Sequence, residues 1–94
     1  MYFNWNNEKN ELLKKERRIS FEEVVWSIEH GLLLDIIEHK NKEKYKNQKI
    51  FIIKMHDYVW QVPFVENEDE IFLKTIIPSR KATKKYLKQG ETNG

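Results

Sequence analysis

Residues 49–77 read KIFIIKMHDYVWQVPFVENEDEIFLKTII, and this stretch decides the fold. It is rich in β-branched and aromatic residues, which favour strands, and its two breaks are His56-Asp57 and the acidic turn 66–70. Such short breaks connect antiparallel neighbours. Together with the similar segment before it, the stretch predicts an antiparallel meander of four strands, Leu32–Glu38, Lys49–Met55, Tyr58–Val65 and Ile71–Ile77.

Two details of this meander follow from its sequence. A basic loop around residues 40–48 joins the first strand to the other three. Pro63 interrupts the third strand, and because proline lacks the N–H that a strand ladder needs, it should lie at a sheet edge or a bulge.

The chain before the meander predicts a short strand followed by two helices. Phe3 and Trp5 alternate with polar residues, as in a strand. Asn6 or Asn7 can then cap a charged helix, which should end near Arg17-Arg18.

The second helix has the strongest start signal in the chain. Ser20 and Glu23 form a capping box, and Ile19 with Val24 supplies the hydrophobic staple. Gly31 provides a left-handed stop. The buried stripe between these signals is Phe21, Val24, Val25 and Ile28.

A basic helix after the last strand completes an α+β domain. The first two helices must cover one face of the sheet, because neither layer can bury its apolar side alone. The other face can carry lysines and polar groups and be open to a ligand. We expect a single domain over residues 1–89 and a disordered tail over 90–94.

Composition excludes several classes of function. The chain has 94 residues and no cysteine, so it has no disulfide framework, thiolate metal site or cysteine nucleophile. Its N-terminus does not read as a secretion signal, and no apolar stretch is long enough to span a membrane. We therefore expect a cytoplasmic protein that does not enter the membrane.

The net charge is only +2, but cations collect in two segments. Residues 40–54 contain six lysines and one acid, whereas residues 80–88 contain five cations and no acid. This distribution suggests a polyanionic partner bound through phosphate contacts. For residues 40–54 alone, solvated lysines that only confer solubility explain the pattern equally well.

The second basic segment begins at a helix start. Pro78 ends the last strand, and the helix opens with Arg80 and Lys81 side by side. Cations are misplaced there, because a helix N-terminus already carries about half a positive charge. Uncapped N–H groups and these two cations would form a pocket for a phosphate or carboxylate; the plainer interpretation is a basic surface helix without a ligand.

No motif indicates a metal, a cofactor or a nucleotide-hydrolysis loop. The three histidines lack the i, i+4 spacing of a zinc site, and no glycine-rich phosphate loop occurs. Metal-free cleavage of RNA remains open, because RNA supplies its own 2′-hydroxyl nucleophile and needs only a base, an acid and cations.

Candidate residues for this chemistry lie in both basic segments and in the acidic turn. His39 could transfer protons and Glu66 could act as a base, although an exposed loop histidine and an ordinary turn are the plainer interpretations. Arg80 has the best individual case, because its planar fork suits a phosphate. Candidate RNA-binding residues are Lys44, Tyr45, Lys46, Lys84 and Lys85.

Trp26 lies off the buried stripe of its helix, beside glutamates and His30. It either packs on the first strand or helix, which is the commoner outcome, or stays exposed and anchors a protein partner.

Three elements in this order resemble the BrnT family of bacterial toxins: Phe3-x-Trp5 before a helix, Ile19-Ser20-Phe21-Glu22-Glu23, and Ser79-Arg80-Lys81-Ala82-Thr83. The resemblance spans nearly the whole chain. It implies a compact RelE-like fold, metal-independent ribonuclease activity and neutralisation by a co-expressed antitoxin.

The resemblance also implies roles and partners. Arg80 and Lys81 stand in the motif itself, and His39 matches a family histidine after the first strand of the meander. Thr75 stands near a position where the family often carries arginine. The antitoxin would be a DNA-binding protein, commonly of the ribbon-helix-helix type, so operator DNA would be reached only through it. The alternative is a non-catalytic module that binds nucleic acid or an acidic protein.

Overall fold

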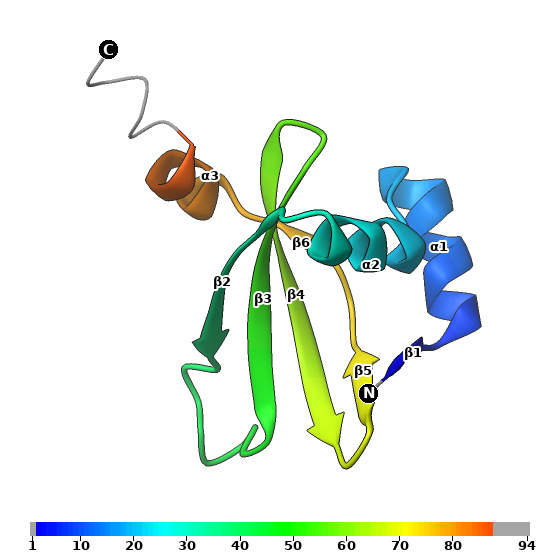
Figure 1. Cartoon of the computed structure of the whole chain (residues 1–94), viewed down its shortest axis with the longest axis vertical. Helices are drawn as coiled ribbons and strands as arrows, with labels where there is room; N and C mark the ends of the chain where they lie inside the picture. The colour runs from blue at the N-terminus through cyan, green and yellow to red at the C-terminus, as the bar shows by residue number, and fades with distance from the viewer. Residues whose placement is uncertain (1, 88–94) are drawn as a thin grey trace.

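The computed structural model describes residues 2–87, so the tail expected at 90–94 lies outside the described residues. The described chain is an α+β structure with one mixed sheet and three helices (Figure 1). Its elements in chain order are β1 Tyr2–Trp5, α1 Asn7–Arg17, α2 Phe21–Glu29, β2 Leu33–Glu38, β3 Gln48–Met55, β4 Tyr58–Asn67, β5 Glu70–Leu73, β6 Ile77–Pro78 and α3 Arg80–Tyr86.

The predicted meander is confirmed. The strands β2, β3, β4 and β5 pair antiparallel with their neighbours in sequence, and a loop over residues 39–47 joins β2 to β3. The turn between β3 and β4 uses His56 and Asp57, both with positive φ, as a two-residue hairpin requires. β1 adds to the far side of β5 in parallel, which gives the sheet order β1-β5-β4-β3-β2.

The prediction of one continuous strand over Ile71–Ile77 is wrong, because the structure divides this segment into β5 and β6. Both parts pair with β4, but residues 74–76 lie opposite only Val62 and Pro63. The extra residue makes a bulge, and the Lys74 N–H donates to the Pro63 carbonyl across it at 2.8 Å. The prediction that Pro63 lies at a bulge is thus confirmed.

The local helix signals act largely as their sequence indicates. Asn6 Oδ1 accepts the Lys9 N–H at 2.9 Å, and Ser20 Oγ accepts the Glu23 N–H at 3.2 Å. Gly31 has φ of +80°. The capping box is only half formed, because the Glu23 carboxylate reaches His56 Nε2 at 2.6 Å rather than its own helix end.

α1 and α2 cover one face of the sheet, as expected. Phe21 and Val24 of α2 are fully buried against the aromatic and aliphatic side chains of β3, β4 and β5. Phe51 and Phe64 stack across the strands with ring centroids 3.8 Å apart, and Trp5 stacks on Phe21 at 5.7 Å.

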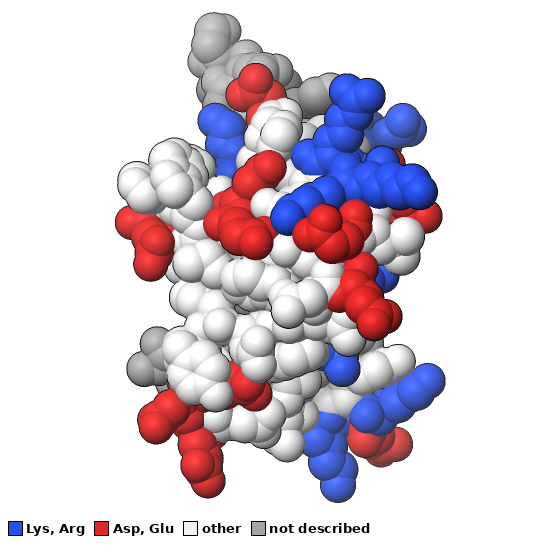
Figure 2. All heavy atoms as spheres, turned by 90° about the vertical axis from the view of Figure 1, so that its right-hand side faces the viewer, with Lys and Arg blue, Asp and Glu red and all other residues white. Residues whose placement is uncertain are grey.

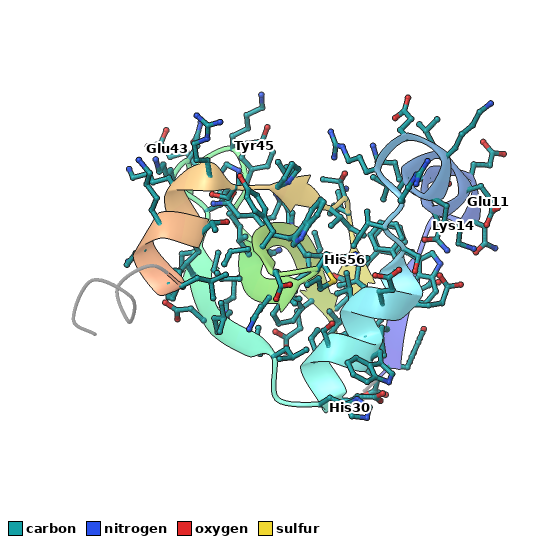
Figure 3. All side chains as sticks on the ribbon, turned by 90° about the horizontal axis from the view of Figure 1, so that it is seen from above. Glu11, Lys14, His30, Glu43, Tyr45 and His56 are labelled. Atoms are coloured by element: carbon teal, nitrogen blue, oxygen red, sulfur yellow. The ribbon has the colours of Figure 1, made fainter. Side chains whose placement is uncertain are left out.

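The other face is not open along its whole length, because α3 packs on it (Figure 3). Ile52 and Val59 are buried there against Ala82, with Leu34 and Ile50 beside them. These strand positions are aliphatic rather than polar, so part of this face must also be covered.

A buried carboxamide joins the first two helices. Asn10 is 2% exposed; its Oδ1 accepts the Phe21 N–H and its Nδ2 donates to Glu22 Oε1, both at 2.8 Å. Because the side chain serves a donor and an acceptor at the start of α2, it fixes α2 relative to α1.

We expect Asn10→Ala to lower the free energy of unfolding by about 1–3 kcal/mol, because it leaves the buried Phe21 N–H without an acceptor. Urea denaturation would measure this change. Asn7→Ala, at an exposed position of the same helix, is the matched control and should change stability by less than about 0.5 kcal/mol. Equal effects of the two substitutions would contradict the role given to Asn10.

Candidate nucleic-acid interface

Three hydrogen bonds fix the start of α3. Two of them join it to Val59 of β4, and the third closes its own first turn. The Ser79 N–H donates to the Val59 carbonyl at 3.0 Å, and the Val59 N–H donates to Thr83 Oγ1 at 2.9 Å. Thr83 Oγ1 in turn donates to the Ser79 carbonyl at 2.7 Å. Both backbone groups of Val59 are thereby satisfied by α3, which seats the helix on the sheet.

The expected pocket of uncapped N–H groups at this helix start is reduced by a cap. Ser79 Oγ accepts the Ala82 N–H at 3.0 Å, so the motif supplies its own cap. Arg80 and Lys81 therefore stand at a helix start where the Ala82 N–H is no longer free to bind an anion. They project from a capped helix as surface cations.

The cations of α3 form two rows. Arg80, Lys81, Lys84 and Lys85 are all exposed, and α3 has no acid in its first turn. At helical spacing, Arg80 lies beside Lys84 and Lys81 lies beside Lys85. The first row borders a cleft of about 370 Å³ lined by Tyr58, Arg80, Thr83 and Lys84.

This arrangement differs from that of α1. Cations and acids are interspersed on the face shown in Figure 2, which carries α1. Lys14 of α1, for example, pairs with Glu11 at 2.9 Å. α3 consequently presents the more uniform positive surface of the two helices.

The other end of α3 is held by a tyrosine. The Tyr86 hydroxyl donates to Asp35 Oδ2 on β2 at 2.8 Å. This hydrogen bond lowers the pKa of the Asp35 carboxyl below 3.8 and raises the pKa of Tyr86 above 10.0. The contact thus favours the folded state above the ordinary carboxyl pKa and below the ordinary phenol pKa, and it is lost beyond the two shifted values.

The loop residues predicted to bind RNA also cluster, but elsewhere. The rings of His39 and Tyr45 lie 4.1 Å apart, and Lys44 Nζ lies 5.3 Å from the Tyr45 ring centre. His39 Nδ1 accepts the Asn41 N–H at 3.1 Å. Lys46 lines a shallow depression with Lys44 and Tyr45.

The structure separates this loop from α3. The loop lies at the lower end of the sheet in Figure 1 and α3 at the upper end. Arg80 borders the same cleft as Tyr58, whereas His39 bonds to Gln48, the partner of Val65. Seven positions of β4 between Tyr58 and Val65 correspond to roughly 20 Å. His39 and Arg80 therefore cannot contact the same phosphate.

Glu66 and Trp26, the two remaining candidates, lie at two other places on the molecule. Glu66 is exposed in a depression with Glu68, Asp69 and Glu70, at the loop end of the sheet and away from Arg80. Trp26 is 54% exposed and stacks on His30 with ring centroids 3.9 Å apart. It borders a hollow of about 210 Å³ together with His56 and Met55. Thr75 lies in the bulge between β5 and β6.

Sequence reasoning missed Tyr58 and the role of Thr83. Tyr58 enters the cleft only because α3 returns to the start of β4, which no local pattern indicates. Thr83 had a detectable signal: it lies four residues after Ser79, and a hydroxyl at that spacing can bond the preceding turn.

No family model, curated protein or solved structure matches this chain. Between residues 2 and 87 no three histidine, aspartate or glutamate side chains group as a metal site would require. Within the same residues, every helix is too short or too polar to cross a membrane.

We expect Thr83→Val to lower the free energy of unfolding by about 1–3 kcal/mol, because valine keeps the shape but leaves the Val59 N–H unsatisfied. Thr83→Ser keeps the hydroxyl and is the matched control. Urea denaturation would compare the three chains. A Thr83→Val protein as stable as the serine variant would contradict the role given to the Thr83 hydroxyl.

Asp35→Ala should lower the pKa of Tyr86 toward 10.0, because it removes the acceptor that stabilises the protonated phenol. The phenolate absorbance would be followed over alkaline pH, and Tyr86→Phe would identify which part of the curve belongs to this residue. Glu38→Ala, on the same strand, is the control that should leave the curve unchanged.

Proposed function

We propose that this protein is a RelE-like toxin that cleaves RNA and is held inactive by an antitoxin, with α3 as its RNA-binding element. The observation that carries the proposal is the capped, acid-free start of α3, whose exposed cations border a cleft beside Tyr58. The resemblance of Ser79–Thr83 and Ile19–Glu23 to the BrnT family gives the biological setting.

The charge arrangement supports binding of an RNA backbone. Arg80 offers a planar fork of donors, and Lys84 lies one helical turn further on the same row. Phosphates along a single strand could follow the two cation rows of α3. The neighbouring rings of His39 and Tyr45, which are tilted by 34° to each other, suit together with Lys44 a base from a more distant part of the same strand.

Cleavage would require three actions at one phosphate. A base removes the proton of the ribose 2′-hydroxyl, whose oxygen attacks the phosphorus and forms a cyclic phosphate; an acid protonates the departing 5′ oxygen. Arg80 would stabilise the charge on the phosphate oxygens. Tyr58 and Lys84 line the same cleft as Arg80, so in this proposal they, rather than His39, would transfer the protons.

A second candidate function is a module that binds RNA or an acidic protein without cleaving it. The observation that favours it is the composition of the cleft, which contains no histidine or carboxylate among its lining residues Tyr58, Arg80, Thr83 and Lys84. In this case binding would depend on salt, and no single residue would be essential.

We expect induced expression of the wild-type chain to arrest bacterial growth and fragment RNA, and Arg80→Ala to relieve both effects, because it removes the cation at the cleft. Lys15→Ala, an exposed cation on α1, is the matched control and should remain toxic. Growth curves and RNA electrophoresis after induction would measure the outcome, with equal expression of the three chains checked on gels.

Binding to a single-stranded RNA oligonucleotide distinguishes the two candidates. Each phosphate contact that α3 loses should reduce the slope of log affinity against log salt by about 0.7. Salt-dependent binding that Arg80→Ala weakens, without RNA fragmentation by the wild type, favours the non-catalytic module. A folded wild type that neither binds nor cleaves RNA rejects the toxin, and it leaves an acidic protein as the only ligand of the second candidate.

A further inference from the structure

The strand β2 forms one edge of the sheet. Within residues 2–87 only its side toward β3 is paired, so its other side presents main-chain groups to solvent (Figure 1). An unpaired edge is a template for an additional strand, and proteins that do not use it usually protect it.

The direction of the main-chain groups can be assigned along β2. The His39 N–H points inward, because it donates to the Gln48 carbonyl of β3 at 3.4 Å. Groups alternate in an antiparallel ladder, so Asp35 and Ile37 also point toward β3, whereas Ile36 and Glu38 point outward. The Ile36 N–H agrees with this assignment, since it donates to Asp35 Oδ1 at 2.8 Å instead of to a strand.

Two of the usual protective residues, lysine and proline, are missing from Asp35–Glu38. The irregularity in its pairing lies before it, between Leu33 and Asp35. Two large aliphatic side chains are exposed, Ile36 at 49% and Ile37 at 37%. The edge therefore presents two neighbouring aliphatic side chains between two acids, and it is extended and accessible over four residues.

The surrounding charges indicate what would pair here. Asp35 already accepts the Tyr86 hydroxyl, and Glu38 accepts Lys42. Lys85 beside Asp35 and Lys49 beside Glu38 also help to lower the pKa of those carboxyls, after the hydrogen bonds from Tyr86 and Lys42. On the side of Ile36, Glu38 is thus balanced by Lys42 and Lys49, whereas on the side of α3 Asp35 is bonded to Tyr86 and the neighbouring Lys85 favours an acidic partner residue.

A second copy of this chain fits the edge poorly. Pairing β2 with its own copy would bring two α3 helices toward each other, because the Tyr86 contact places the end of α3 against β2. Each α3 carries four exposed cations, so the two basic surfaces would repel.

We propose that Asp35–Glu38 pairs, main chain to main chain, with an extended segment of another protein in which aliphatic and acidic residues alternate. Residues of that segment on the side of Ile36 would be aliphatic, and residues on the side of α3 would be acidic, facing Lys85. This inference does not depend on RNA binding or cleavage.

The test uses a displayed library of random twelve-residue peptides, selected on the full wild-type chain and counter-selected on Ile36→Pro. Proline at this position removes an outward N–H without removing a bond to β3, so the sheet should be retained. We expect enrichment of peptides that alternate aliphatic and acidic residues. A synthetic copy of the best peptide should bind Ile36→Pro about tenfold more weakly than wild type in fluorescence anisotropy.

Two further variants make the test decisive. Ile36→Lys replaces the exposed aliphatic side chain with a residue that protects natural edges, and it should also weaken binding; it serves if the proline variant does not fold by circular dichroism. Tyr2→Lys makes the same kind of change on β1, the opposite edge, and should bind the peptide like wild type.

Several results would overturn the proposal. They are no enrichment, enrichment of basic peptides, or equal binding by wild type and both Ile36 variants. A wild-type chain that is a dimer by light scattering and becomes monomeric on Ile36→Lys would show that a second copy occupies the edge instead.

Discussion

The rest of the basic surface depends on how Val59 is satisfied. Val59 lies near the start of β4, just beyond Trp60 and Gln61, with which β6 pairs. The residue is fully buried, so neither β6 nor water bonds its outward N–H and carbonyl groups. Ser79 supplies a donor to its carbonyl and Thr83 an acceptor to its N–H. Because these two residues stand four positions apart, the chain must turn into a helix at this point, and the helix must lie against the sheet.

This constraint divides the motif Ser79–Thr83 into two sets of residues with different roles. Ser79, Ala82 and Thr83 face the sheet, and the latter two are buried, so these three residues form the contact between α3 and β4. Arg80 and Lys81 fill the positions between and remain exposed. The contact with the sheet therefore determines where this helix start can carry charge: every residue that caps or packs is already used there, and only the outward positions are free.

Much of the fold could be predicted, because its signals are local. The caps at Asn6 and Ser20, the stop at Gly31 and the alternation within β3 and β4 each act over a few residues. Pro63 indicated an irregularity for a chemical reason that holds in any sheet. The division of β5 from β6 was not predictable from residues 71–77 alone, because the cause lies in the partner strand.

The candidate site was less predictable from the sequence than the fold was. The separation of His39 from Arg80 followed from the predicted meander, because the first and the fourth of four antiparallel strands end at opposite ends of the sheet; the closer contacts of the site did not. Glu23 was assigned to a capping box, whereas the hairpin turn brings His56 close enough to compete for it. Tyr58 and the packing of α3 depend on the return of the chain to β4. Such contacts join residues far apart in sequence, and no local pattern encodes them.

The parallel pairing of β1 has a consequence for the order in which the molecule is built. Tyr2 pairs with Glu70, which is synthesised 68 positions later. At about 5–20 residues per second, the ribosome needs on the order of several seconds to supply that partner. During this interval Phe3 and Trp5 lack the strand against which they pack. The sheet can therefore be completed only when nearly all of the described chain has been made, and its outermost strand is the one that waits longest.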